Sequence, residues 1–315
     1  MHFLLIITGF ALLIFGANYL VDGAVGVAKR FKVSDLVIGL TIVAFGTSAP
    51  EMVINLFAAA DPSTTDIALT NIIGSNQINT FLILGATALV LPIQSQASSR
   101  KFDIPLSLAA PLLLLIPAFF RNEVTRTDAM LLLAIFVFFM FVTVRKAMKA
   151  RATHYTDETE NSGKLFKTGI YFIMVFGGLV LLVAGGRIIV NSATAIAESL
   201  GISQAVVGLS IVALGTSLPE LATSVVAAFK KKTDIAIGNI IGSNIFNVFL
   251  VLGISATIRP LPTYQNMPVD LAIAALGSLL VLIYVWTNKK HEIKRWEGLL
   301  LLCIYFAYMT WTIAS

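Results

Sequence analysis

Charged side chains are scarce in this sequence. Only 12% of its 315 residues are charged and 57% are hydrophobic, with a mean hydropathy of +0.88, whereas soluble domains carry about 25% charged residues. Apolar runs long enough to cross about 30 Å of hydrocarbon, roughly 20 residues each, recur along the whole chain. The composition excludes a soluble domain of useful size and predicts a polytopic membrane protein.

Cysteine and histidine are also nearly absent. Cys303 is the single cysteine and cannot form an internal disulfide, while His2, His154 and His291 lie at a terminus or in predicted loops. The sequence therefore offers neither a disulfide framework nor a Cys/His metal site, and we expect no cofactor. The first apolar run has no basic segment before it and no small-residue cleavage site, which favours a retained helix over a signal peptide.

Ten apolar runs predict an all-α polytopic membrane protein with ten transmembrane helices. We expect these spans near residues 3–27, 34–60, 67–92, 103–120, 127–148, 168–197, 204–229, 235–258, 268–287 and 296–313. One connection is long and polar, between Arg145 and Lys167, and it divides the spans five and five. We therefore expect a first five-helix repeat at 1–148, a linker at 149–167 and a second repeat at 168–315.

Two long motifs occur once in each half. VIGLTIVAFGTSAPE begins at Val37 and VVGLSIVALGTSLPE at Val206; DIALTNIIGSNQINTFLILG begins at Asp66 and DIAIGNIIGSNIFNVFLVLG at Asp234. They occupy the second and third spans of their halves. Because each half has an odd number of spans, the second half must enter the membrane from the opposite side. The repeat is thus inverted, as in many secondary transporters, whose sites lie near mid-membrane between the halves.

Basic residues are distributed unevenly between the loops. One set of alternate loops holds eighteen of the 22 Lys and Arg residues, the other set holds Arg121, Arg126 and Arg259, and Arg187 falls within a span. The positive-inside rule places the richer set, which includes the linker, in the cytoplasm and both termini outside. This orientation accounts for the net charge of +5 better than nucleic-acid binding does.

Two glutamates lie in the middle of predicted spans. An ionised carboxylate near the bilayer centre costs at least a few kcal/mol, so Glu51 and Glu220 mark a functional site. Each follows a proline, Pro50 or Pro219, which cannot donate a backbone hydrogen bond and leaves upstream carbonyls without helical partners. Carbonyls, hydroxyls and a carboxylate together predict an oxygen cage for a cation.

The third span of each half adds neutral oxygens. Ser75 and Asn79, and likewise Ser243 and Asn247, are four residues apart and share a helical face. With neither sulfur nor imidazole, this set favours Na⁺ and Ca²⁺ over zinc or copper. Two glutamates neutralise one Ca²⁺ or hold Na⁺ in its place, and ions that compete for the same charges give antiport.

These motifs resemble those of the sodium/calcium exchanger branch of the calcium/cation antiporters. The resemblance covers both alpha repeats and the ten-span plan of the prokaryotic-type members, which have no large regulatory loop. It implies ion ligands at Ala44, Thr47, Ser48, Glu51, Ser75, Asn79, Ala213, Thr216, Ser217, Glu220, Ser243 and Asn247, with the alanines acting through their carbonyls.

The resemblance also implies alternating access, with the first and sixth spans sliding against the rest, and about three Na⁺ exchanged per Ca²⁺. The expected partners are these ions and the lipid bilayer. The sequence leaves the oligomeric state open and is compatible with a functional monomer. Asp22 and Arg187, in the first and sixth spans, are interpreted as structural residues.

Other functions fit less well. A calcium/proton or other cation antiporter is the main alternative, but the proton-coupled branch usually carries a carboxylate where this chain has Gly74 and Gly242. A channel would use similar oxygens without needing an inverted repeat. An intramembrane enzyme would need a nucleophile with a base or a matched aspartate pair, and the spans offer neither. We therefore expect a transporter and not an enzyme.

Overall fold

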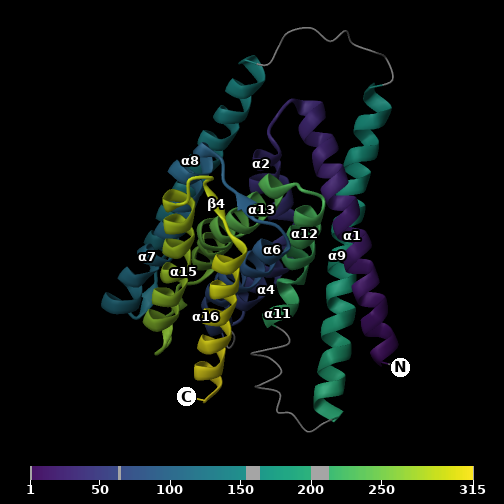
Figure 1. The fold of residues 1–315 in the computed structure, drawn as a ribbon. Coiled ribbons are helices and arrows are strands. Elements are labelled where there is room, and N and C mark those ends of the chain that lie inside the picture. The colour runs from purple at the N-terminus through teal and green to yellow at the C-terminus, as the bar shows by residue number, and fades with distance from the viewer. Residues whose placement is uncertain (1, 63–64, 154–163, 200–212, 315) are drawn as a thin grey trace.

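A computed structural model describes residues 2–62, 65–153, 164–199 and 213–314, which are almost entirely helical (Figure 1). Labels with η denote π-helical segments. The elements up to Thr153 are α1 (His2–Phe31), α2 (Asp35–Ile38), η1 (Gly39–Val43), α3 (Ala44–Thr47), α4 (Ala49–Ala60), α5 (Thr65–Gln77), η2 (Ile78–Ile83), α6 (Leu84–Val90), β1 (Ile93–Gln94), η3 (Ser99–Asp103), α7 (Ile104–Phe120), β2 (Glu123–Val124) and α8 (Arg126–Thr153). Those after it are α9 (Lys164–Ser199), α11 (Ala213–Thr216), α12 (Leu218–Phe229), α13 (Thr233–Ile245), η5 (Phe246–Leu252), α14 (Gly253–Ile258), β3 (Leu261–Pro262), α15 (Met267–Thr287), β4 (Glu292–Ile293) and α16 (Arg295–Ala314).

Seven helices in the described part of the chain are long and apolar enough to cross a membrane, and a bent pair adds an eighth. The bent pair is residues 35–47 with 49–60, within the predicted second span. The predicted seventh span begins among residues outside the described ranges, and its remainder contains the shorter α12. Helix α8 runs into the predicted linker and α9 begins inside it, while the rest of the linker lies outside the described residues.

The helices that carry the repeated motifs lie inside the molecule. In the most apolar window of Thr233–Ile258, 94% of residues are buried, against 22% for α8. In Figure 1, α4, α6, α12 and α13 lie between the α1/α9 pair on one side and α7, α8, α15 and α16 on the other. The two chain ends lie at the same end of the bundle, and α8 ends at the opposite one. The outer helices thus flank the motif helices on two sides.

Glycines let α1 and α9 pack almost backbone to backbone. A Cβ atom on Gly16 would lie 2.8 Å from the carbonyl oxygen of Gly178, and one on Gly178 would lie 2.7 Å from that of Gly16. Gly9 and Gly185 meet in the same way one layer further along. Small residues at such spacing are how membrane helices associate closely. The first and sixth predicted spans therefore form one paired unit.

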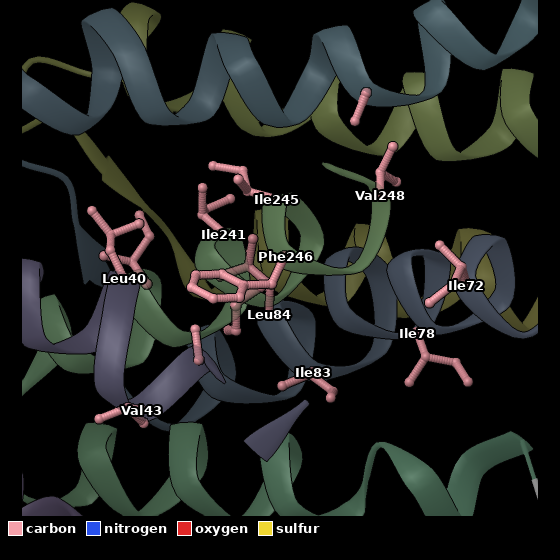
Figure 2. Packing of buried hydrophobic residues seen from close by; sticks show 14 of the residues in the cluster. Leu40, Val43, Ile72, Ile78, Ile83, Leu84, Ile241, Ile245, Phe246 and Val248 are labelled. Carbon is pink, nitrogen blue, oxygen red and sulfur yellow. The ribbon is translucent and has the colours of Figure 1, made fainter. Parts of the chain in front are cut away.

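The apolar core fills the space between the motif helices. Figure 2 shows Leu40 of η1 on the side of Ile241, Ile245 and Phe246 at the junction of α13 and η5, and Val43 further along η1. All five side chains are buried. These apolar side chains thus pack the motif helices of the two halves against each other.

Two short β-ribbons join the halves at their ends. β1 pairs antiparallel with β4, and β2 pairs antiparallel with β3. β1 and β3 follow the third predicted span of their own halves, while β2 and β4 precede the last one. Each ribbon therefore combines a strand from one half with the non-equivalent strand from the other, an exchange expected when two similar halves are related by a pseudo-twofold axis.

Candidate cation site

Both GTS-x-PE motifs break their helix at a serine. Ser48 separates α3 from α4 with φ −82° and ψ 7°, and the two segments are bent by 49°. Ser217 separates α11 from α12 with nearly the same angles, φ −89° and ψ 3°. Pro50 and Pro219 fall in the first turn of the helix that follows, where a backbone donor is not needed. The repeated sequence has produced the same local structure twice.

The break determines which carbonyls are free. In a continuous helix the Gly46 carbonyl would accept from residue 50, and Pro50 has no N–H to donate. The Ala44 carbonyl still accepts from the Ser48 backbone N–H at 3.0 Å and from the Thr47 hydroxyl at 3.4 Å. The Gly46 carbonyl loses its helical donor and shares the Ser48 backbone N–H with the Ala44 carbonyl. Ala213, the equivalent of Ala44, is the first residue of α11.

The two glutamates lie in the interior, each against a serine of the other half. Ser48 donates its hydroxyl to Glu220 Oε1 at 3.0 Å, and Ser217 lies 3.5 Å from Glu51 Oε1. Both glutamates are only 1% exposed. They occupy the first turns of α4 and α12, where the helix dipole favours a negative charge. The arrangement brings two carboxylates from opposite halves into one buried site.

The motif threonines line the same region. Thr47 donates to Asn239 Oδ1 at 3.0 Å, and Asn239 in turn donates to Ser224 Oγ at 3.0 Å and to the Glu220 carbonyl at 3.4 Å. Thr216 faces the carboxylate of Glu51. Thr47 and Thr216 are both buried. Each threonine thus belongs to a network that joins the two halves.

The four neutral candidates of the third spans are all buried. Ser75 and Ser243 lie in α5 and α13, close to their ends, whereas Asn79 and Asn247 lie in the π-helical segments η2 and η5 that follow. π-Helical turns widen a helix by one residue and often occur at functional sites. Each pair thus spans an α-to-π junction, a feature that the prediction of a shared helical face did not include.

Several buried oxygens at this site have no hydrogen-bonding partner. They include Glu51 Oε2, Glu220 Oε2, Asn79 Oδ1, Asn247 Oδ1 and Ser243 Oγ. Leaving a buried polar atom unpaired costs about 1–3 kcal/mol, so the set fits a site whose partners are cations. Within the described residues no three His, Cys, Asp or Glu side chains cluster. A hard cation bound by two carboxylates and neutral oxygens is the chemistry that this donor set supports.

Several asparagines in this network were not among the predicted ligands. Asn239 contacts Thr47, Asn71 donates to Asn55 Oδ1 at 2.8 Å, and Asn76 and Asn244 bond across the two halves. Four of these five belong to the N-x-x-G-S-N segments that recur in both halves. Their repetition was the available signal, because packing alone does not require an amide side chain at the same place twice.

A cavity of about 260 Å³ reaches the site between α9 and the broken helices. Pro50, Pro219 and Thr216 line one side, and Arg187 and Asn191 of α9 line the other. Arg187 makes neither an ion pair nor a hydrogen bond with any described residue. Arg187 thus lines the cavity without a polar partner among the described residues.

The equivalent space in the other half is closed. Helix α1 packs directly against α12, and Lys230 Nζ at the end of α12 lies 2.6 Å from Asp22 Oδ1. The same ammonium group donates to the Asn18 carbonyl at 3.3 Å. Asp22 thus joins α1 to the central bundle, as expected for a structural residue.

Comparisons with known proteins agree with this geometry. The family model described as sodium/calcium exchanger protein matches residues 1–145 and 170–314. The chain is 36% identical to the putative antiporter CaxA of Alkalimonas amylolytica, with 96% of each chain covered, and 34% identical to the sodium/calcium exchanger MaX1 of Methanosarcina acetivorans, with 98% and 97% covered. A solved structure of the sodium-calcium exchanger NCX_Mj, soaked with 2.5 mM Na⁺ and 10 mM Sr²⁺, matches with a TM-score of 0.84, 30% identity and 98% and 99% coverage.

Proposed function

The chain belongs to the sodium/calcium exchanger protein family, and we propose that it exchanges Na⁺ for Ca²⁺ through one buried site held between Glu51 and Glu220. The observation that carries this proposal is the reciprocal contact of each glutamate with a serine of the other half. Two negative charges in one interior site match one Ca²⁺, and Na⁺ ions compete for the same oxygens. The competition couples the two fluxes.

With its site empty, the protein is expected not to change easily between its outward-open and inward-open states. Two bare carboxylates in the membrane interior are costly, whereas a site loaded with Ca²⁺ or with Na⁺ is close to neutral. This difference suppresses uncoupled movement of the protein between its two access states. The site must therefore hold ions during the change of access state in each direction, which makes transport an exchange.

The ligands that we propose are those implied by the motifs. They are Ala44, Thr47, Ser48, Glu51, Ser75, Asn79, Ala213, Thr216, Ser217, Glu220, Ser243 and Asn247. Support comes from the burial of the polar members and from the unpaired oxygens among them. We add the Gly46 carbonyl to this set, because Pro50 leaves it without a helical donor.

The proposed architecture has ten spans in two inverted five-helix repeats, at 1–148 and 168–315, joined by a linker at 149–167. The swapped β-ribbons and the reciprocal serine–glutamate contacts support an inverted relationship. The basic loops favour a cytoplasmic linker with both termini outside. A monomer contains the whole site that these contacts define.

The unequal spaces beside the α1/α9 pair support alternating access. The cavity lies between α9 and α4, on the side of the site that we assign to the outside, while α1 and α12 close the cytoplasmic side. Exchanging these contacts between the two halves would close the outer cavity and open an inner one. We therefore assign the structure to an outward-facing state, from which the α1/α9 pair moves to give the inward-facing one.

The test is a flux assay on the purified full-length chain in liposomes. Uptake of radioactive Ca²⁺ is measured with an outward gradient of Na⁺, K⁺ or H⁺, each against choline controls of equal osmolarity. We expect uptake only with the Na⁺ gradient. Uptake driven by H⁺ would replace this proposal with a calcium/proton antiporter. Uptake without any opposing gradient would indicate a channel.

A further inference from the structure

Asn76 connects the two repeats through its side-chain amide. Its Nδ2 donates to the backbone carbonyl of Asn244 at 3.2 Å, and its Oδ1 accepts from Asn247 Nδ2 at 3.0 Å. All three residues are at least nine-tenths buried. Asn76 comes from α5 in the first half, and its two partners come from the junction of α13 and η5 in the second.

The direction of this series of hydrogen bonds is fixed by its last acceptor. A backbone carbonyl can only accept a hydrogen bond, so Asn76 must direct its NH₂ group toward Asn244. The Asn76 oxygen then faces Asn247, which must answer with its own NH₂ group. Asn247 Oδ1 is left on the opposite side, buried and without a hydrogen-bonding partner. The Asn244 carbonyl thus sets the orientation of the Asn76 amide and, through it, that of the Asn247 amide.

We propose that Asn76 is a positioning residue that determines which end of the Asn247 amide faces the transported ions. The inference rests on the proposed function, in which Asn247 is an ion ligand. An amide oxygen carries partial negative charge and coordinates a cation, whereas the NH₂ group carries partial positive charge and repels it. If Asn76 is removed, the Asn247 amide is free to turn and to present the wrong end.

The contact has no counterpart in the other repeat. Asn244, which occupies the place of Asn76 in the second half, donates to the Thr80 hydroxyl at 2.9 Å, and a hydroxyl can act as donor or acceptor. Asn244 Oδ1 accepts no hydrogen bond, so Asn79 does not donate to it. The orienting device therefore acts on residue 247 alone.

Asn76 is also matched to an asparagine at position 247. Aspartate there would place an acceptor oxygen against Asn76 Oδ1, and Asn76 could turn its NH₂ group toward it only by facing the Asn244 carbonyl with its own oxygen. Aspartate has two equivalent oxygens and needs no orientation. The effect of removing Asn76 should consequently depend on the chemical identity of residue 247, which a purely structural role would not require.

The experiment measures the KM for Ca²⁺ in Na⁺-driven uptake by the full-length chain in liposomes. The variants are Asn76→Ala and Asn247→Asp, alone and combined, together with Gln77→Ala as the matched control. Gln77 is the next residue of α5, is also buried, and donates its amide to a backbone carbonyl, that of Asp270, at 2.8 Å. Loss of a residue that orients a metal ligand typically costs 10–100-fold in affinity.

We expect Asn76→Ala to raise the KM at least tenfold in the wild-type background and less than twofold in the Asn247→Asp background. Gln77→Ala should change the KM by less than about twofold in both. Equal losses from Asn76→Ala in the two backgrounds would overturn the positioning role. If Asn76→Ala does not fold, Asn76→Ser, too short to reach both partners, replaces it. Absence of exchange by the wild-type chain would instead overturn the proposed function.

Discussion

Neutralising Glu220 is the sharpest test of the shared site. Glu220→Gln keeps the size of the side chain and an oxygen for Ser48, whose hydroxyl donates to Glu220 Oε1 at 3.0 Å. It removes one of the two negative charges in a site whose carboxylates are almost fully buried. Glu51 then faces a divalent ion alone. We expect Na⁺-driven Ca²⁺ uptake to fall to background while the protein remains folded.

The magnitude follows from the charge of the ion. At a typical Ca²⁺–oxygen distance of about 2.4 Å and an effective dielectric constant of about 20, removing one negative charge forfeits about 14 kcal/mol of direct attraction for Ca²⁺ and about 7 kcal/mol for Na⁺. Most of this is offset, because the neutral side chain costs less to bury. If about a third of the difference between the ions survives, affinity for Ca²⁺ falls roughly fiftyfold more than affinity for Na⁺, which is enough to take Ca²⁺ uptake to background.

The assay compares Ca²⁺ uptake with Na⁺/Na⁺ exchange in the same liposomes. Glu220→Gln should abolish the first and weaken the second less. Asp103→Asn is the matched control, because Asp103 is also a buried acid, 2% exposed, in a predicted span. It lines a different cavity, with Thr143 and Lys146, that contains none of the proposed ligands. This control separates loss of the ion site from loss of any intramembrane charge.

Two results would refute the reasoning. Near-normal Ca²⁺ uptake by a folded Glu220→Gln protein would mean that the paired acids are not the ion site. An equal loss in Asp103→Asn would mean that the assay reports general damage to the membrane domain. Folding of each variant is checked by a single symmetric peak in size-exclusion chromatography before reconstitution.

Three further predictions concern packing, ion choice and orientation. Gly178→Ala places a Cβ atom 2.7 Å from a backbone carbonyl of α1. It should lower the thermal unfolding midpoint by the equivalent of about 1–3 kcal/mol. Gly177→Ala should not, because a Cβ atom at that position has no described atom within 4 Å. Na⁺-driven Ca²⁺ uptake should be the same in potassium and in choline, because Asn247 adds no third negative charge to compensate a K⁺ ion bound together with Ca²⁺. Asn247→Asp should introduce sensitivity to potassium or pH. A wild-type chain that requires potassium would contradict this count of two charges. In a background without the native cysteine, Asn122→Cys should react with an impermeant thiol reagent in intact cells and Lys290→Cys only after permeabilisation; the opposite pattern would invert the topology.

Much of the fold was accessible from hydrophobicity and repetition. The apolar runs located the long helices because a membrane span needs about 20 apolar residues whatever its neighbours are. The breaks near Pro50 and Pro219 followed from the missing backbone donor. The helix ends were less accessible: α1 extends to Phe31 and α8 to Thr153, since polar residues at a membrane surface can continue a helix.

The π-helical segments were not predicted. The spacing of Ser75 and Asn79 fits one α-helical face, but Asn79 lies in η2, and Asn247 likewise lies in η5. A π-turn replaces one hydrogen-bond register with another, and the choice between them depends on what the widened turn contacts. Asn247, for example, donates to Asn76 of the other half, and no local pattern in the sequence encodes that contact.

The sequence by itself determined that this is a membrane protein of two related halves with a carboxylate in each, because composition, repetition and the cost of a buried charge are properties of the chain alone. The tertiary structure decided which polar side chains of the two halves form hydrogen bonds with each other. Ser48 is paired with Glu220 and not with the Glu51 that follows it three residues later, since the helix break turns the hydroxyl toward the other half. The orientation of the Asn247 amide is set in the same way, by a backbone carbonyl that acts through Asn76. Such contacts depend on how the two halves pack, and covalent order does not specify that packing.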